Sequence, residues 1–101
     1  MAQFDVYINS NPSTKEEIPY LLDIQNDILK SLNTRVVVPL ARNQKEIKHL
    51  TPIFNIEGTM LVMLTSQLAG VPLSILGDKI TNVEDRRVDI LGAIDFMVTG
   101  F

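Results

Sequence analysis

Few side chains in this sequence are of a kind that does chemistry. The chain has no cysteine and a single histidine, His49. Disulfides, thiolate metal sites and multi-histidine metal sites are therefore excluded. His49 lies in the charged stretch 45–49, where no motif places a second titratable group beside it, so we interpret it as a solvated surface histidine. We predict no catalytic residue, no metal and no cofactor.

The charged residues do not form a recognisable site either. Asp23 and Asp27 are four residues apart, but paired acid–base catalysis depends on a geometry that spacing does not supply, and we interpret both as solvated turn residues. The five glycines are isolated, so no glycine-rich phosphate loop is present. The net charge is −3, and the arginines alternate with acidic residues. The sequence therefore predicts neither an enzyme nor a nucleic-acid-binding face.

The most informative element is a helix predicted over residues 82–101. Asn82 can cap its first turn, with Thr81 and Glu84 as an alternative capping box. At 100° per residue, one face of this helix is apolar, and Phe96 falls on the other, mostly polar face. The apolar face comprises Val83, Ile90, Leu91, Ile94, Met97, Val98 and Phe101. The final turn either packs on the core or presents Phe96, Thr99, Gly100 and Phe101 to a partner.

The remaining elements are predicted to be short strands, over 3–9, 20–24, 35–40, 52–56, 59–64 and 71–76. In the first, Phe4, Val6 and Ile8 should be buried and Asp5 and Tyr7 exposed. Pro39 indicates a sheet edge or a strand end. Glu57-Gly58 supplies a hairpin turn, and Gly77-Asp78 ends the last strand. Regular short strands followed by one helix predict a small antiparallel barrel in a single domain, residues 1–101.

Two segments leave alternatives open. Residues 60–64 are apolar throughout, which predicts burial on both faces, in the core or at an oligomer interface. Residues 26–33 are either one helical turn or a loop, and 41–50 form a surface excursion.

No secretion signal is visible at the N-terminus, and the longest apolar run is too short to span a membrane.

Several segments together resemble one family. They are Gln3-Phe4 with Val6-Tyr7, residues 22–29, 35–40 and 71–77, and Ala93-Ile94-Asp95-Phe96-Met97 with Gly100-Phe101. In order and spacing they resemble the CcdB toxins of toxin–antitoxin modules, over essentially the whole chain. Residues 41–50 match least, as expected of a surface loop.

The resemblance implies a mainly β fold, an SH3-like antiparallel β-barrel with a small β-wing and one C-terminal α-helix. It also implies a cytoplasmic bacterial homodimer that is not an enzyme. CcdB toxins bind the A subunit of DNA gyrase and trap the enzyme on cleaved DNA. A CcdA antitoxin neutralises them through its disordered C-terminal segment, and operator DNA is bound only through the antitoxin complex. Exposed dimer-side strands and Arg86/Arg87 are predicted docking points for that segment.

Carried over by position, the gyrase-binding residues are Ile28, Leu29, Asp95, Thr99, Gly100 and Phe101. The family pattern has Asn in place of Asp95, an aromatic in place of Thr99 and Ile in place of Phe101. Interfaces depend on a few buried anchors, so the change at Thr99 is expected to weaken binding. Two other functions stay open at this point, namely a MazF-like endoribonuclease toxin and a non-toxic SH3-like interaction module.

Overall fold

A computed structural model describes residues 1–29 and 31–100. Its strands are β1 (Asp5–Asn9), β2 (Tyr20–Asp23), β3 (Thr34–Ala41), β4 (Ile53–Ile56), β5 (Thr59–Met63), β6 (Ala69–Pro72) and β7 (Leu76–Asn82). Its helices are α1 (Arg87–Thr99) and the 3₁₀ turns η1 (Asp27–Leu29), η2 (Thr65–Gln67), η3 (Leu73–Ile75) and η4 (Glu84–Arg86). None of the helices in the described residues is long and apolar enough to cross a membrane.

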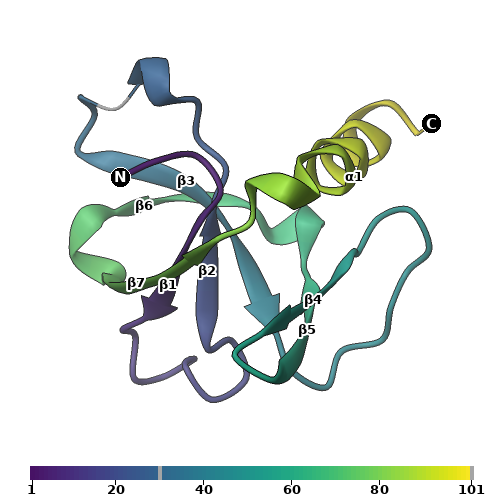
Figure 1. Ribbon diagram of the computed structural model, residues 1–101, viewed down its shortest axis with the longest axis horizontal. Coiled ribbons are helices and arrows are strands. Elements are labelled where there is room, and N and C mark those ends of the chain that lie inside the picture. Colours follow the sequence, from purple (N-terminus) through teal and green to yellow (C-terminus); the bar gives the residue numbers. More distant parts are fainter. Residues whose placement is uncertain (30, 101) are drawn as a thin grey trace.

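All the strands pair antiparallel in one curled sheet, in the order β4-β5-β3-β2-β1-β7, with β6 beside β3. In Figure 1 the turn between β2 and β3 projects at the upper left and helix α1 lies at the upper right, both near the same end of β1 and β2. The prediction of a mainly β, SH3-like barrel with one C-terminal helix is confirmed.

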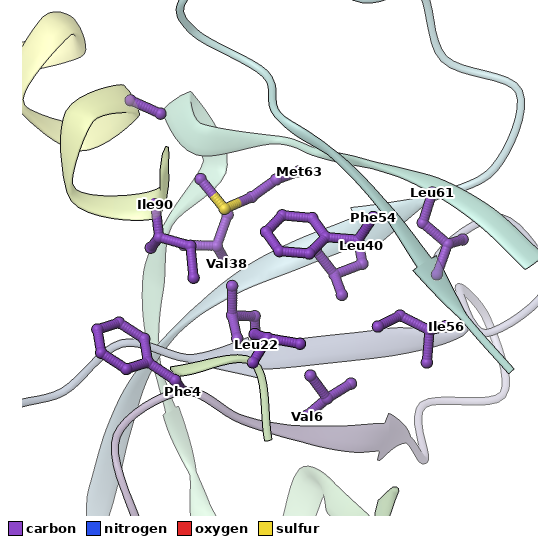
Figure 2. Close-up of a cluster of buried hydrophobic side chains, with 12 residues drawn as sticks. Phe4, Val6, Leu22, Val38, Leu40, Phe54, Ile56, Leu61, Met63 and Ile90 are labelled. Atoms are coloured by element: carbon purple, nitrogen blue, oxygen red, sulfur yellow. The ribbon is translucent and has the colours of Figure 1, made fainter. Parts of the chain in front are cut away.

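The core fills the concave side of the sheet with side chains from five strands and the helix (Figure 2). Its fully buried members include Phe4, Val6, Leu22, Val38, Leu40, Phe54, Leu61, Met63 and Ile90. Burying each such side chain stabilises the fold by about 1.5–3 kcal/mol. Strands β1 to β5 therefore fix the surface on which α1 rests.

The predicted alternation in β1 is only partly correct. Val6 is buried as expected, but Ile8 is 37% exposed, whereas Asp5 and Tyr7 are buried. Two register shifts in the β1–β7 pairing, on either side of Tyr7, disrupt the simple two-residue period. The Tyr7 hydroxyl donates to Asp5 Oδ2 at 3.0 Å, so the second face of β1 is a buried polar layer and not a solvated one.

Strand β3 is central, so the prediction that Pro39 marks an edge or a strand end is wrong. β3 pairs with β2 along one side, and its other side is shared by β6 over 34–37 and β5 over 40–41. Pro39 falls between these two partners, where its missing N–H removes no ladder bond. Its carbonyl accepts a hydrogen bond from the Leu64 N–H at 2.9 Å.

The predicted strand 71–76 is also wrong, because that segment contains the end of β6, the turn η3 and the start of β7. Gly77 and Asp78 do not end a strand but lie inside β7. A Cβ added at Gly77 would be 2.9 Å from the Ile8 carbonyl oxygen. This glycine therefore marks a close approach of β1 to β7 and not a turn.

The hairpin β4–β5 is confirmed. Glu57 and Gly58 both have positive φ, 52° and 82°, as the tightest hairpin turns require. The Gly58 N–H donates to Asn55 Oδ1 at 3.0 Å. Residues 61–63 are buried as predicted, but Met60 is 60% exposed, so the strand is not covered on both faces along its whole length. Residues 42–49 are exposed, as expected of a surface excursion.

Helix α1 is shorter and less buried than predicted. Asn82 Oδ1 accepts from the Glu84 N–H at 2.9 Å, but this bond opens η4, and the α-helix begins only at Arg87. Within α1, Ile90 and Ala93 are buried, Ile94 and Met97 are half-buried, and Leu91 and Val98 are exposed. The prediction of a wide buried apolar face is therefore wrong, since Ile90 and Ala93 are the buried residues of α1.

Gly77→Ala should lower the free energy of unfolding by about 1–3 kcal/mol, because the methyl group forces β1 away from β7. Gly92→Ala is the matched control, since a Cβ there has no neighbour within 4 Å. In a helix interior this second change should stabilise the protein by roughly 0.5–1 kcal/mol. Urea unfolding measures both, and equal effects would contradict the close approach.

The Tyr7 hydroxyl should make stability fall at high pH. Burial, followed by the hydrogen bond to Asp5, raises the pKa of Tyr7 far above its ordinary value of 10.0. Below pH 10 this contribution is fully present. As pH rises further, the unfolded chain ionises first, and stability should fall by about 1.4 kcal/mol per pH unit. Urea midpoints above pH 10 should lose this extra slope in Tyr7→Phe and keep it in Tyr20→Phe.

Candidate functional site

The turn η1 presents apolar side chains to solvent. Ile28 is 85% exposed, and Leu29 and Leu32 are about half exposed. The Ile28 N–H donates to Asn26 Oδ1 and the Leu29 N–H to the Asn26 carbonyl, both at 2.9 Å. The ambiguous segment 26–33 thus contains a 3₁₀ turn with no buried residue. Clustered exposed apolar side chains of this kind typically mark a contact surface.

Beneath this turn lies a buried ion pair. Nε and Nη2 of Arg35 are 2.8 and 2.7 Å from Asp23 Oδ2, and both side chains are almost completely buried. The prediction that Asp23 is a solvated turn residue is wrong. Burial raises the pKa of the Asp23 carboxyl, and the hydrogen bonds from Arg35 and from the Gln25 N–H oppose that rise. The prediction holds for Asp27, whose side chain is 57% exposed.

Gln25 joins the ion pair to the turn. Its backbone N–H donates to Asp23 Oδ1 at 3.0 Å. Its side-chain Oε1 accepts from the Val36 N–H at 3.0 Å, and its Nε2 donates to the Leu29 carbonyl at 2.9 Å. One amide therefore connects β3 to the end of η1. The sequence hint for this network was Asp23 itself, a charged residue between Leu22 and Ile24.

The last turn of α1 holds the other predicted residues. Asp95, Thr99 and Gly100 are exposed there, and Val98 beside them is 73% exposed. The Thr99 hydroxyl donates to the Asp95 carbonyl at 2.8 Å, and the Gly100 N–H donates to the Phe96 carbonyl at 2.8 Å. Gly100 has φ 80°, a left-handed helix end that suits glycine. Phe101 lies outside the described residues.

The two groups of predicted residues do not meet in one chain. The turn between β2 and β3 projects on the left of Figure 1, and the last turn of α1 projects on the right. Each group is exposed and partly apolar, but a single copy offers them as two separate surfaces.

A cleft of about 580 Å³ between residues 46–53 and α1 was not predicted. The ring of Phe96 lies on one side of it, 5.9 Å from the His49 ring at a tilt of 50°. Phe96 therefore has a partner on its own chain. His49 is exposed as predicted, but it packs against this aromatic ring. Arg86, which also lines the cleft, bonds Asp89 at 2.9 Å, and its guanidinium lies 4.4 Å from the centre of the Phe54 ring.

The arginines proposed to dock an antitoxin already make contacts of their own. Besides the contacts of Arg86, the Arg87 guanidinium lies 5.6 Å from the centre of the Phe4 ring. These stacked geometries hold both side chains on the outer surface of the core. A docking segment would have to approach arginines whose guanidinium groups already stack on aromatic rings.

Comparison with protein families agrees with this fold. A family model described as CcdB protein matches residues 3–100, nearly the whole chain. That length includes the sheet, the turn η1 and α1 up to Gly100. The resemblance drawn from five short segments is thus confirmed. This chain belongs to the CcdB family, whose members are toxins of toxin–antitoxin modules that poison DNA gyrase.

Proposed function

We propose that this protein binds the A subunit of DNA gyrase and traps the enzyme on cleaved DNA. The family match over residues 3–100 is the observation that carries the proposal. The binding surface consists of Ile28 and Leu29 on η1 and of Asp95, Thr99, Gly100 and Phe101 at the end of α1. The protein acts in the bacterial cytoplasm, where gyrase works, and performs no covalent chemistry itself.

The exposure of the described residues supports this assignment. Ile28, at 85% exposed, contributes almost nothing to the core, so its apolar surface is available to a partner. Large side chains buried at the centre of an interface supply most of its energy. At the helix end Thr99 is small and its hydroxyl bonds the Asp95 carbonyl. Ile28, Leu29 and Phe101 are therefore the principal apolar anchors.

A homodimer explains how two separate surfaces form one site. Two copies related by a two-fold axis would place two helix ends side by side, opposite the two-fold axis of the gyrase A dimer. Ile94 and Met97 are half-buried in one chain, and Val98 is exposed. These side chains near the helix end provide apolar surface for a second copy.

The poisoning mechanism is a shift in population. A rigid dimer wedged between the two gyrase A subunits binds the open, cleaved conformation better than the closed one. The enzyme accumulates in that state in proportion to the difference in affinity. A CcdA-like antitoxin neutralises the toxin through a disordered segment, and operator DNA is bound only through that complex.

Deleting residues 99–101 should abolish gyrase binding and leave a folded dimer that still binds its antitoxin. The residues removed follow the last buried side chain of α1, so the core is unchanged. Gyrase cleavage assays, circular dichroism and size-exclusion chromatography test the three parts of this prediction. A truncated protein that still trapped cleaved DNA would disprove the assignment of the helix end.

Ile28→Ala should weaken gyrase binding at least fivefold, because an interface anchor contributes more than about 1 kcal/mol. Stability should change by less than about 0.5 kcal/mol, since the side chain is exposed. Ile47→Ala removes the same atoms from the exposed loop at the other end of the sheet and is the matched control. Titration calorimetry with purified gyrase A subunit decides, and equal affinities for the two variants would exclude η1 from the interface.

A further inference from the structure

We infer that the buried network of Asp23, Arg35 and Gln25 is a positioning device that sets where Ile28 and Leu29 are presented. The inference rests on the proposed function, because it treats η1 as a gyrase-binding turn. Gln25 is buried and cannot touch gyrase, so it controls the affinity for gyrase through the position of the turn.

The first support is that η1 has no apolar anchor. None of its residues is buried, so core packing does not hold it. Its position depends on polar contacts at each end. Gln3 donates its N–H to Asp27 Oδ1 at 2.8 Å and its side-chain amide to the Ile24 carbonyl at 3.1 Å. At the far end Gln25 Nε2 holds the Leu29 carbonyl at 2.9 Å.

The second support is that the network is a poor choice for stability alone. A buried ion pair is often no more stabilising than apolar residues of the same volume. Among the described residues, Arg35 Nη1 is buried with no hydrogen-bond partner, which adds an uncompensated loss of hydration. Hydrogen bonds are directional, so the network fixes the position of the η1 backbone. Apolar residues in its place would not fix an exposed turn.

A substitution at Gln25 can change the position of η1 without unfolding the protein. Removing Arg35 or Asp23 would leave an unpaired buried charge and risk unfolding. Gln25→Met keeps the length and volume of the side chain and leaves the ion pair intact. It deletes the bond to Leu29 and leaves the Val36 N–H without its side-chain acceptor.

Tyr7→Phe is the matched control. It removes a buried hydrogen bond from the neighbouring polar layer, to Asp5, without touching η1. Both variants are compared with the wild type in the full-length protein, at a temperature where all three are folded. Affinity for purified gyrase A subunit should fall about tenfold in Gln25→Met and less than twofold in Tyr7→Phe. Amide hydrogen exchange at Leu29 and Leu32 should accelerate only in Gln25→Met.

A double-mutant cycle with Ile28→Ala shows whether Gln25 acts through the turn. In the Ile28→Ala background, Gln25→Met should lower affinity by clearly less than tenfold, because the group it positions is already missing. Additive losses, or equal losses in Gln25→Met and Tyr7→Phe, would overturn the positioning role while leaving gyrase binding intact. A wild-type protein that does not bind gyrase would overturn the proposed function and this inference with it.

Discussion

The arrangement of the whole molecule depends on how strand β3 shares one of its edges. Its first half pairs with β6 and its last residues with β5, while β2 pairs with residues 37–40 on the other edge. β6 connects β3 to the turn, and β5 connects β3 to the core beneath α1. The Leu73 N–H that follows β6 bonds the Asn33 carbonyl at the turn end, whereas β5 contributes Met63 to the core beneath α1. Because one strand serves both, β3 links the position of the turn to the part of the core on which α1 rests.

The sequence revealed the fold class because its core strands are strongly patterned. Val36 to Leu40 and the Glu57-Gly58 turn were recognisable from residue type alone, and the family segments set their order. Positions that depend on contacts distant in sequence were missed. Pro39 suggests an edge until the gap between β6 and β5 is known, and Gly77 suggests a turn until β1 is seen 2.9 Å away. The exposed helix face was missed because periodicity reports an apolar stripe without showing how wide its partner surface is.

The exposed residues of the candidate site were predictable from the sequence, whereas the buried residues that support them were not. Ile28, Leu29, Asp95, Thr99 and Gly100 came from family resemblance, and the structure adds that all five are exposed. Their supporting residues could not be assigned from spacing. Asp23 lies twelve residues from Arg35, and the two side chains are buried together only when β2 and β3 pair. The contact between His49 and Phe96 joins residues 47 positions apart, and no local pattern indicates it.

The narrow attachment of α1 has a consequence for how such a toxin evolves. Ile90 and Ala93 are the buried residues of α1 and Ile94 packs against the core beside them, so the residues beyond carry little of the folding free energy. Substitutions such as Asp95 and Thr99 can accumulate there without endangering the fold. The proposed gyrase-binding residues at the end of the helix can thus change while the scaffold stays constant, and divergence in target preference within the family is expected to concentrate there.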